Sequence, residues 1–196
     1  MDRPEKRPTI ILDNTNFIFM TNFSGDPERD NYGNPQRQAT IIIPTQEQAD
    51  EMADLGLNVK VTKPKPGKED EYEPTYFVKA LIRYDCKYKP RIFLVSKDKK
   101  PVLLDEESVK VLDNVYVLNV KAELSQSWDE RNRRWNLYVK TMYVEQDTSS
   151  RFPGDPFAAD YDIIDPEAYI LNKISDLEAD FGTELLLDVI NKKFSH

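Results

Sequence analysis

The sequence has very little of what common catalytic and nucleotide-binding sites are built from. Its one histidine is His196, the last residue, and its one cysteine is Cys86. These counts exclude Ser-His-Asp and Cys-His catalysis, zinc sites that contain histidine, and clusters of zinc-binding thiolates. The six glycines form neither G-x-G-x-x-G nor G-x-x-x-x-G-K-S/T, so no phosphate-binding glycine loop is evident. We predict a protein that is not an enzyme, with no metal and no cofactor.

Long apolar runs are also absent. Residues 1–8 are charged, and no stretch approaches the roughly eighteen apolar residues of a membrane helix. A single cysteine excludes an internal disulfide, which suits a reducing compartment. The 196 residues, 39% hydrophobic and 32% charged, fit one domain plus an appendage. We therefore expect a soluble, cytoplasmic protein with no signal peptide and no membrane contact.

Charge is distributed unevenly along the chain. Residues 1–151 hold 24 Lys and Arg against 25 Asp and Glu, whereas residues 152–196 hold 3 against 10. Most of the net charge of −8 thus lies in the C-terminal segment. We predict a nearly neutral domain over residues 1–151 and an acidic linker with a helical appendage over residues 152–196. Such an appendage can compete with nucleic acid for a cationic groove or bind partner proteins.

Short segments rich in β-branched and aromatic residues dominate the body and predict strands. They are residues 9–23 (bent near Asp13 and Asn14), 39–43, 58–62, 76–84, 91–96, 115–124 and 135–144. We expect 76–84 to pair with 91–96, and 115–124 with 135–144 around a polar, basic tip over 125–134. The result is an α+β, mainly β fold: a small antiparallel barrel of the OB-fold type with short inserted helices.

A capping pattern predicts the first inserted helix. Thr45-x-x-Gln48 fits a capping box, and Gly56 suits the position just after the helix end. The residues expected on the inner face are Ala49, Met52 and Ala53.

Asp105 is placed to cap a second short helix that runs through Leu112, with Glu106 and Glu107 in its first turn. The same three carboxylates are also the kind of side chain that holds Mg²⁺. A metal-dependent nuclease therefore stays open as an alternative function.

Aromatic and cationic residues alternate through residues 76–93. Exposed rings among cations are what single-stranded nucleic acid needs, because bases stack and phosphates pair with positive charge. An ordinary hairpin is the alternative, since aromatic residues favour strands anyway. The candidate binding residues in this stretch are Lys79, Tyr84, Lys87, Tyr88, Lys89 and Arg91.

A second cluster is the segment WDERNRRW at residues 128–135. Guanidinium groups stack on bases and pair with phosphates, so this tip is a candidate clamp for a single strand. The alternative is a solvated tip whose tryptophans fold back on the sheet, with Trp135 the better core candidate. The predicted binding residues are Trp128, Arg131, Arg133 and Arg134.

Three phenylalanines end the first strand. Phe17 and Phe19 share one face at period two, which is typical of the core. Phe23 lies at the strand end and is the better candidate for stacking, with Arg37 nearby in the sequence.

The acidic segment contains an apolar stripe. Residues 145–162 are rich in proline and predict a linker, in which 152–157 is either a spacer or a docking motif. A helix is expected to begin at Asp165-Pro166. The predicted partner-binding residues are Phe157, Ile170, Ile174, Leu177 and Phe181. Their stripe must be buried against the barrel, a second copy or a partner, so a protein-interaction accessory factor is the main alternative function.

Several stretches occur in a characteristic order: 22–25 (NFSG), 57–60 (LNVK), 88–95 (YKPRIFLV), 104–112, 114–115 and 137–144 (LYVKTMYV). This ordered set resembles the phage-encoded single-stranded-DNA-binding proteins with an OB-fold. The resemblance implies a protein that coats and protects single-stranded DNA during replication, recombination or repair in an infected bacterium. It also implies an acidic C-terminal region that recruits replication or recombination proteins. The apolar stripe and the basic Lys192 and Lys193 depart from the family pattern and favour self-association or a partner-specific contact.

Overall fold

The computed structural model describes residues 7–30, 32–64, 73–96 and 100–147, and this part of the chain is mainly β, as predicted. The elements are β1 (Ile10–Thr15), η1 (Pro27–Arg29), β2 (Gln38–Ile42), α1 (Gln46–Asp54), β3 (Lys60–Val61), β4 (Tyr76–Leu81), β5 (Arg91–Val95), β6 (Val102–Leu104), η3 (Ser108–Asn114), β7 (Val117–Asp129) and β8 (Arg134–Gln146). Here η denotes a 3₁₀ helix. The predicted linker start at residue 145 is wrong, because β8 continues to Gln146; the rest of the predicted linker from residue 148 and the helical appendage lie outside the described residues. Within the described ranges, no helix has the length and apolar character needed to span a membrane.

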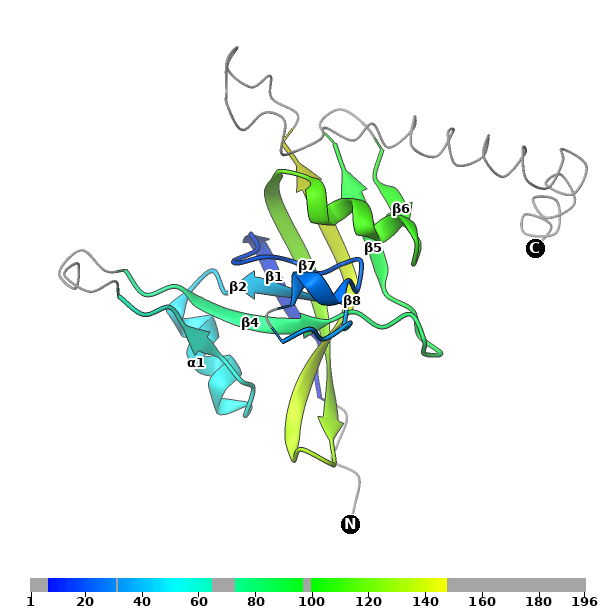
Figure 1. The fold of residues 1–196 in the computed structure, drawn as a ribbon. Coiled ribbons are helices and arrows are strands. Elements are labelled where there is room, and N and C mark those ends of the chain that lie inside the picture. The colour runs from blue at the N-terminus through cyan, green and yellow to red at the C-terminus, as the bar shows by residue number, and fades with distance from the viewer. Residues whose placement is uncertain (1–6, 31, 65–72, 97–99, 148–196) are drawn as a thin grey trace, which may run out of the picture. The chain divides into compact units, whose positions relative to one another are not determined.

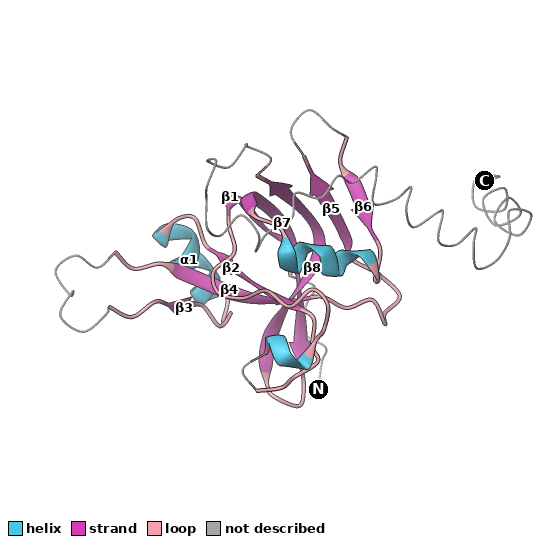
Figure 2. Ribbon diagram, turned by 45° about the horizontal axis from the view of Figure 1, so that its top comes forward, coloured by secondary structure: helices cyan, strands magenta, loops and turns pink. Residues whose placement is uncertain are grey.

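All these strands belong to one eight-stranded sheet, with β1-β7-β8-β4-β2 as its main order. Strand β3 pairs with β4, β6 pairs with β5, and β5 pairs with β8. Figures 1 and 2 show α1 and β3 near the same end of β4, away from β5 and β6. Past β1, the bridges Phe17–Ile41 and Asn22–Gln38 join the chain to β2. Backbone hydrogen bonds therefore also connect the two ends of the main strand order.

Side chains alternate between the two faces of each strand, and one face forms the core. On β4, Val78 and Ala80 are buried whereas Lys79 between them is exposed. The same alternation buries Ala39 and Ile41 of β2. The largest fully buried side chains include Phe23, Leu12, Ile41, Ile92, Leu94, Leu124 and Met142. The opposite face of β2 and β4 therefore points away from the core.

The predicted bend in the first strand and the first capped helix are both confirmed. The β1–β7 register shifts between Leu12 and Thr15, and Asn14 has φ 53°. Thr45 Oγ1 accepts a hydrogen bond from Gln48 N at 3.2 Å, and Gly56 has φ 74° just past the helix end. Of the three residues expected to face inward, Ala49 and Met52 are buried, whereas the prediction for Ala53 is wrong because it is exposed.

The second predicted helix is present as η3. Asp105 Oδ1 accepts hydrogen bonds from Ser108 N at 2.7 Å and Glu107 N at 3.1 Å, so it holds the turn that leads into η3. Glu107 is the N-cap residue and makes no side-chain cap hydrogen bond, so the predictions of Asp105 as the cap and of Glu106 and Glu107 in the first turn are wrong. The helix is a 3₁₀ helix and ends at Asn114, just beyond the predicted Leu112.

The predicted hairpin is formed by β7 and β8, but its strands are longer than the sequence indicates. Ser125 pairs with Tyr138, and Trp128 pairs with Trp135. The turn at the tip is confined to residues 130–133 rather than 125–134. Figure 1 shows this hairpin extending well past the rest of the sheet.

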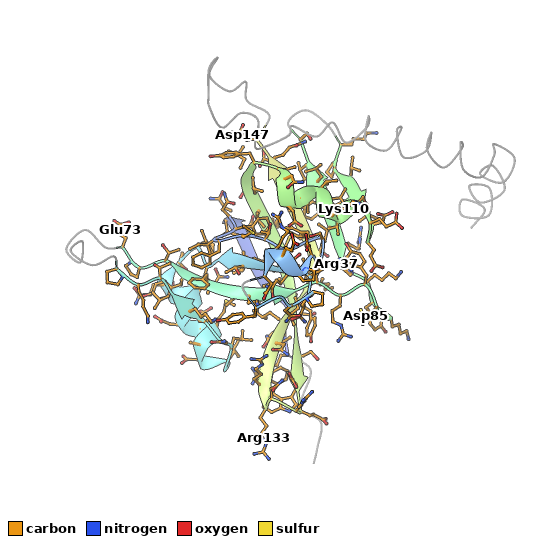
Figure 3. All side chains as sticks on the ribbon, in the orientation of Figure 1. Arg37, Glu73, Asp85, Lys110, Arg133 and Asp147 are labelled. Atoms are coloured by element: carbon orange, nitrogen blue, oxygen red, sulfur yellow. The ribbon has the colours of Figure 1, made fainter. Side chains whose placement is uncertain are left out.

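The predicted pairing of 76–84 with 91–96 is wrong. Strands β4 and β5 both pair with β8, in parallel and one after the other: Leu81 lies opposite Tyr138, and Arg91 lies opposite Thr141. The sheet is thus mixed rather than purely antiparallel. The loop 82–90 connects β4 to β5, which pair with neighbouring parts of β8. It projects from the sheet where Asp85 is labelled in Figure 3.

Candidate nucleic-acid interface

The outer face of β4 carries Phe77, Lys79 and Leu81, which alternate with the buried Val78 and Ala80. Their antiparallel partners on β2 are Ile42, Thr40 and Gln38. Because β2 and β4 pair in this register, a ring, a cation and an apolar side chain stand in a row on the solvent side of the sheet.

A groove of about 400 Å³ lies beside this row, between β4 and the β7–β8 hairpin. Lys79 and Leu81 line it from β4, and Arg134, Trp135 and Tyr138 line it from β8. Amide side chains add neutral hydrogen-bonding groups: Asn34, Gln36, Asn58, Asn132 and Asn136. We call this cleft the β4 groove. Besides the carboxylate of Asp129, it combines flat rings, cations and amides, the three kinds of group that contact bases and phosphates.

The hairpin tip presents the arginines Arg131, Arg133 and Arg134, all exposed, with Arg133 at the extremity in Figure 3. Asp129 accepts hydrogen bonds from Asn132 Nδ2 at 2.8 Å and from Asn132 N at 3.1 Å. These hydrogen bonds hold the pKa of Asp129 below its ordinary value. Among the described residues, none of the three guanidinium groups forms an ion pair, so their charge is available to an anion.

Trp128 and Trp135 face each other across the hairpin, with ring centroids 5.4 Å apart in an edge arrangement. Trp128 is 37% exposed, whereas the Trp135 ring is partly covered by the guanidinium of Arg7, whose Cζ lies 3.9 Å from the ring centroid. Trp135 therefore both supports the hairpin and lines the β4 groove. From the sequence, a core role and a DNA-binding role are alternatives, whereas the position of Trp135 allows both.

The loop 82–90 presents a second exposed ring. Tyr88 is 82% exposed, and the ammonium of Lys87 lies 5.4 Å from its ring centroid. Lys89 is exposed on the same loop. Arg83 is held at the base of the loop by a two-point ion pair with Asp85, at 2.9 and 3.0 Å. The side-chain hydrogen bond from Arg83 lowers the pKa of Asp85.

Two predicted stacking residues are buried, and their predicted role is wrong. Phe23 has no exposed surface, packs edge-on against Phe17 at 5.5 Å, and donates its backbone N–H to Asp113 at 2.8 Å. Tyr84 is 6% exposed, and burial raises the pKa of its hydroxyl to about 12. Neither ring offers a face to a base.

Arg37 is engaged within the protein. Its Nη1 lies 2.9 Å from Glu106 Oε1, and its Cζ lies 5.6 Å from the Tyr84 ring centroid. The ion pair with Arg37 accounts for Glu106, and hydrogen bonds within the turn before η3 account for Asp105, so neither needs a metal ion to explain it. The described residues contain no group of three or more His, Cys, Asp or Glu that would hold a metal ion. The absence of catalysis stays a prediction.

The predicted binding residues therefore fall into four places. Lys79 and Arg134 meet in the β4 groove. Trp128, Arg131 and Arg133 lie on the hairpin, and Lys87, Tyr88 and Lys89 lie on the loop 82–90. Arg91 follows on β5, 5.4 Å from the Phe93 ring. The predicted partner-binding residues Phe157, Ile170, Ile174, Leu177 and Phe181 lie outside the described residues.

Sequence reasoning missed Leu81 and Tyr138 as groove residues. Period-two alternation within the strands places both on the face opposite the core. What the sequence does not reveal is that Leu81 and Tyr138 become neighbours through a parallel pairing between distant segments.

The family described as "Putative phage ssDNA-binding domain" matches residues 3–185. The chain belongs to this family. The resemblance drawn from the sequence is thereby confirmed, and so is the predicted function at this level: the protein binds single-stranded DNA. No curated protein matches the sequence.

Solved structures of the same kind of protein are similar to the chain. The single-stranded DNA-binding protein from bacteriophage Enc34, in a C-terminal truncation, is 12% identical with a TM-score of 0.45, covering 73% of this chain and 88% of that chain. Its complex with ssDNA has the same identity and TM-score, covering 74% and 89%. The gp2.5 single-stranded DNA binding protein encoded by bacteriophage T7 is 12% identical with a TM-score of 0.37, covering 76% and 99%.

Proposed function

We propose that the protein holds single-stranded DNA in the β4 groove, with the β7–β8 tip and the loop 82–90 as flanking arms. The observation that carries this proposal is the composition of the groove. Trp135 and Tyr138 offer rings to bases, while Lys79 and Arg134 lie beside them as phosphate partners. Each stacked base is worth about 1–3 kcal/mol, independent of its identity.

The sheet geometry supports the same placement. We infer an OB-type barrel, because the bridges from Phe17 to Ile41 and from Asn22 to Gln38 join the ends of the main strand order. In such barrels, nucleic acid lies across the second and third strands and contacts the loop between the last two strands. Here those elements are β2, β4 and the β7–β8 tip, and the last two line the β4 groove together with the segment that leads into β2.

The two arms add positive charge to the surface beyond the groove. Arg131 and Arg133 lie at the end of one arm, and Lys87 and Lys89 lie on the other. Cations spread in this way neutralise several successive phosphates, so binding should weaken steeply as salt is raised. We further propose that the protein protects single strands during phage replication or recombination in the host cytoplasm, with the acidic segment after residue 151 serving partner proteins.

A titration of labelled oligothymidine at two salt concentrations tests the site. Tyr138→Ala should weaken binding by about 1–3 kcal/mol, because it removes a ring, whereas Tyr138→Phe keeps the ring and should bind as the parent does. Quenching of tryptophan fluorescence reports contact near Trp128 and Trp135.

Equal affinity of Tyr138→Ala and the parent would exclude the β4 groove as the binding site. A parallel incubation with single-stranded DNA and Mg²⁺ separates binding from cleavage. A binding protein leaves the strand whole, and shortened products would favour the nuclease alternative.

A further inference from the structure

Phe19 is an exposed ring on a strained piece of backbone. It lies in the segment after β1, is 66% exposed, and has φ 64° in the left-handed region. A bulky non-glycine residue rarely adopts this conformation, and such strain concentrates at binding sites. Just before it, Ile18 N donates to Thr40 O at 2.9 Å, which fixes the chain against β2. The turn directs the phenyl ring away from the core.

The Phe19 ring is in contact with the face that carries the β4 groove. Its centroid lies 5.3 Å from that of Phe77, with the rings nearly perpendicular at 80°. Phe77 is two residues before Lys79 on the outer face of β4, and Lys79 lines the β4 groove. Phe77 and Phe19 thus continue the row of side chains beyond the far end of that groove.

A second groove begins at Phe19. It has a volume of about 590 Å³ and lies between residues 16–21 and 112–117. Phe19, Met20 and Tyr116 line it and are 66%, 66% and 52% exposed. Exposed apolar side chains gathered in this way mark a binding surface. We call it the Phe19 groove.

The charged groups of the Phe19 groove are already paired. Arg29 Nη2 donates to the backbone oxygen of Asp113 at 2.9 Å, and Arg29 Nε lies 3.6 Å from the Asp113 carboxylate. Asn16 and Thr21 supply neutral polar groups along the same wall. A groove that offers rings but no unpaired charge suits bases rather than phosphates. The β4 groove differs, because Lys79 and Arg134 line it.

We propose that the Phe19 groove is a second base-stacking subsite, in which Phe19 and Tyr116 hold the bases of a strand that continues from the β4 groove past Phe77. This inference rests on the proposed function, because it extends the same DNA path. Its consequence is a binding site with two parts: a charged part that grips phosphates and an apolar part that accepts bases.

Oligothymidines of two lengths test this subsite in the full chain, since one such domain covers roughly 4–16 nucleotides. For an oligomer of about 12 nucleotides, Phe19→Ala and, separately, Tyr116→Ala should each weaken binding about tenfold, the loss of one stacked base. For an oligomer of about 4 nucleotides, held by the charged β4 groove, affinity should be unchanged. Phe19→Tyr keeps the ring and should restore parental binding. Leu103→Ala, which shortens another exposed apolar side chain on β6, is the matched control.

The outcomes separate this inference from the proposed function. If Phe19→Ala leaves both oligomers unaffected while Tyr138→Ala weakens both, the second subsite is rejected and the β4 groove stands. If neither variant alters binding, the proposed site itself fails. If Phe19→Ala changes only the sedimentation behaviour of the protein, the groove joins copies of the chain and the base-binding assignment is overturned. If Phe19→Ala lowers the melting temperature, its loss of affinity could reflect misfolding, and the DNA affinity of Tyr116→Ala then tests the subsite independently.

Discussion

The carboxylate of Asp113 holds the backbone of Phe23 through a 2.8 Å hydrogen bond. The same carboxylate accepts from Ser24 N at 2.8 Å and from the Thr21 hydroxyl at 3.1 Å. One side chain at the end of η3 therefore fixes the segment that follows β1. This is the segment that buries Phe23 and exposes Phe19.

Replacing Asp113 should destabilise the protein severely. The side chain is 3% exposed, and Asp113→Ala would leave its three donors without their acceptor and remove the carboxylate that pairs with Arg29. Removing one partner of a buried charged network costs about 3–5 kcal/mol. The free energy of unfolding in urea measures this, with Asp13→Ala as control, because the Asp13 carboxylate is exposed, where it pairs with Lys121 and accepts a hydrogen bond from Asn14 N. Equal stability of the two variants would contradict the role assigned to Asp113.

Tyr84 gives a prediction at alkaline pH. Burial raises the pKa of its hydroxyl from 10.0 to about 12, so the folded state favours the neutral form. The corresponding stability is present below pH 10 and is lost as pH rises toward 12. Among the described residues, no group forms a hydrogen bond with this hydroxyl.

Tyr84→Phe should therefore be neutral or slightly stabilising at pH 7, since no hydrogen bond is removed. It should also remove part of the alkaline loss of stability, which melting curves at several pH values would measure. DNA affinity should stay at the parental value, because the ring is buried. A large loss of affinity would restore Tyr84 as a DNA contact.

The salt dependence of DNA affinity distinguishes side chains that contact phosphates from charged side chains that do not. Lys79→Ala and Arg134→Ala should each weaken DNA binding and make the slope of log K against log salt shallower by about 0.7, the value for one phosphate on a single strand. Lys110→Ala is the matched control, because Lys110 is an exposed lysine on η3 that does not line the β4 groove (Figure 3). A slope that responds equally to all three substitutions would indicate diffuse attraction rather than a site.

Local patterns in the sequence predicted the parts of the fold that depend on interactions between residues close in sequence. The Thr45 cap and the hydrogen bond from Ser108 N to Asp105 each join residues three positions apart, and both are present. The parallel registers of β4 and β5 against β8 join segments about fifty residues apart. No turn or periodicity encodes such registers, so the β4 groove did not follow from the sequence.

The roles of Phe19 and Phe23 are reversed relative to the sequence prediction for a related reason. Period two assigns Phe17 and Phe19 to one face only while the strand is regular. After Thr15 the chain pairs through isolated bridges, and the positive φ of Phe19 turns its ring outward. Asp113 then draws Phe23 inward. The left-handed backbone at Phe19 and the hydrogen bond from Phe23 N to Asp113 together exchange the exposed ring for the buried one.

Substitution of Tyr88 should affect DNA affinity but not the stability of the fold. Its ring is 82% exposed, so Tyr88→Ala should change the free energy of unfolding by no more than about 0.5 kcal/mol. If the ring stacks on a base, the same substitution should weaken DNA binding by about 1–3 kcal/mol, whereas Tyr88→Phe should bind as the parent does. Urea unfolding and oligothymidine titration of the same three proteins supply both quantities. Parental affinity in Tyr88→Ala would remove the loop 82–90 from the stacking surface and leave only its lysines as contacts.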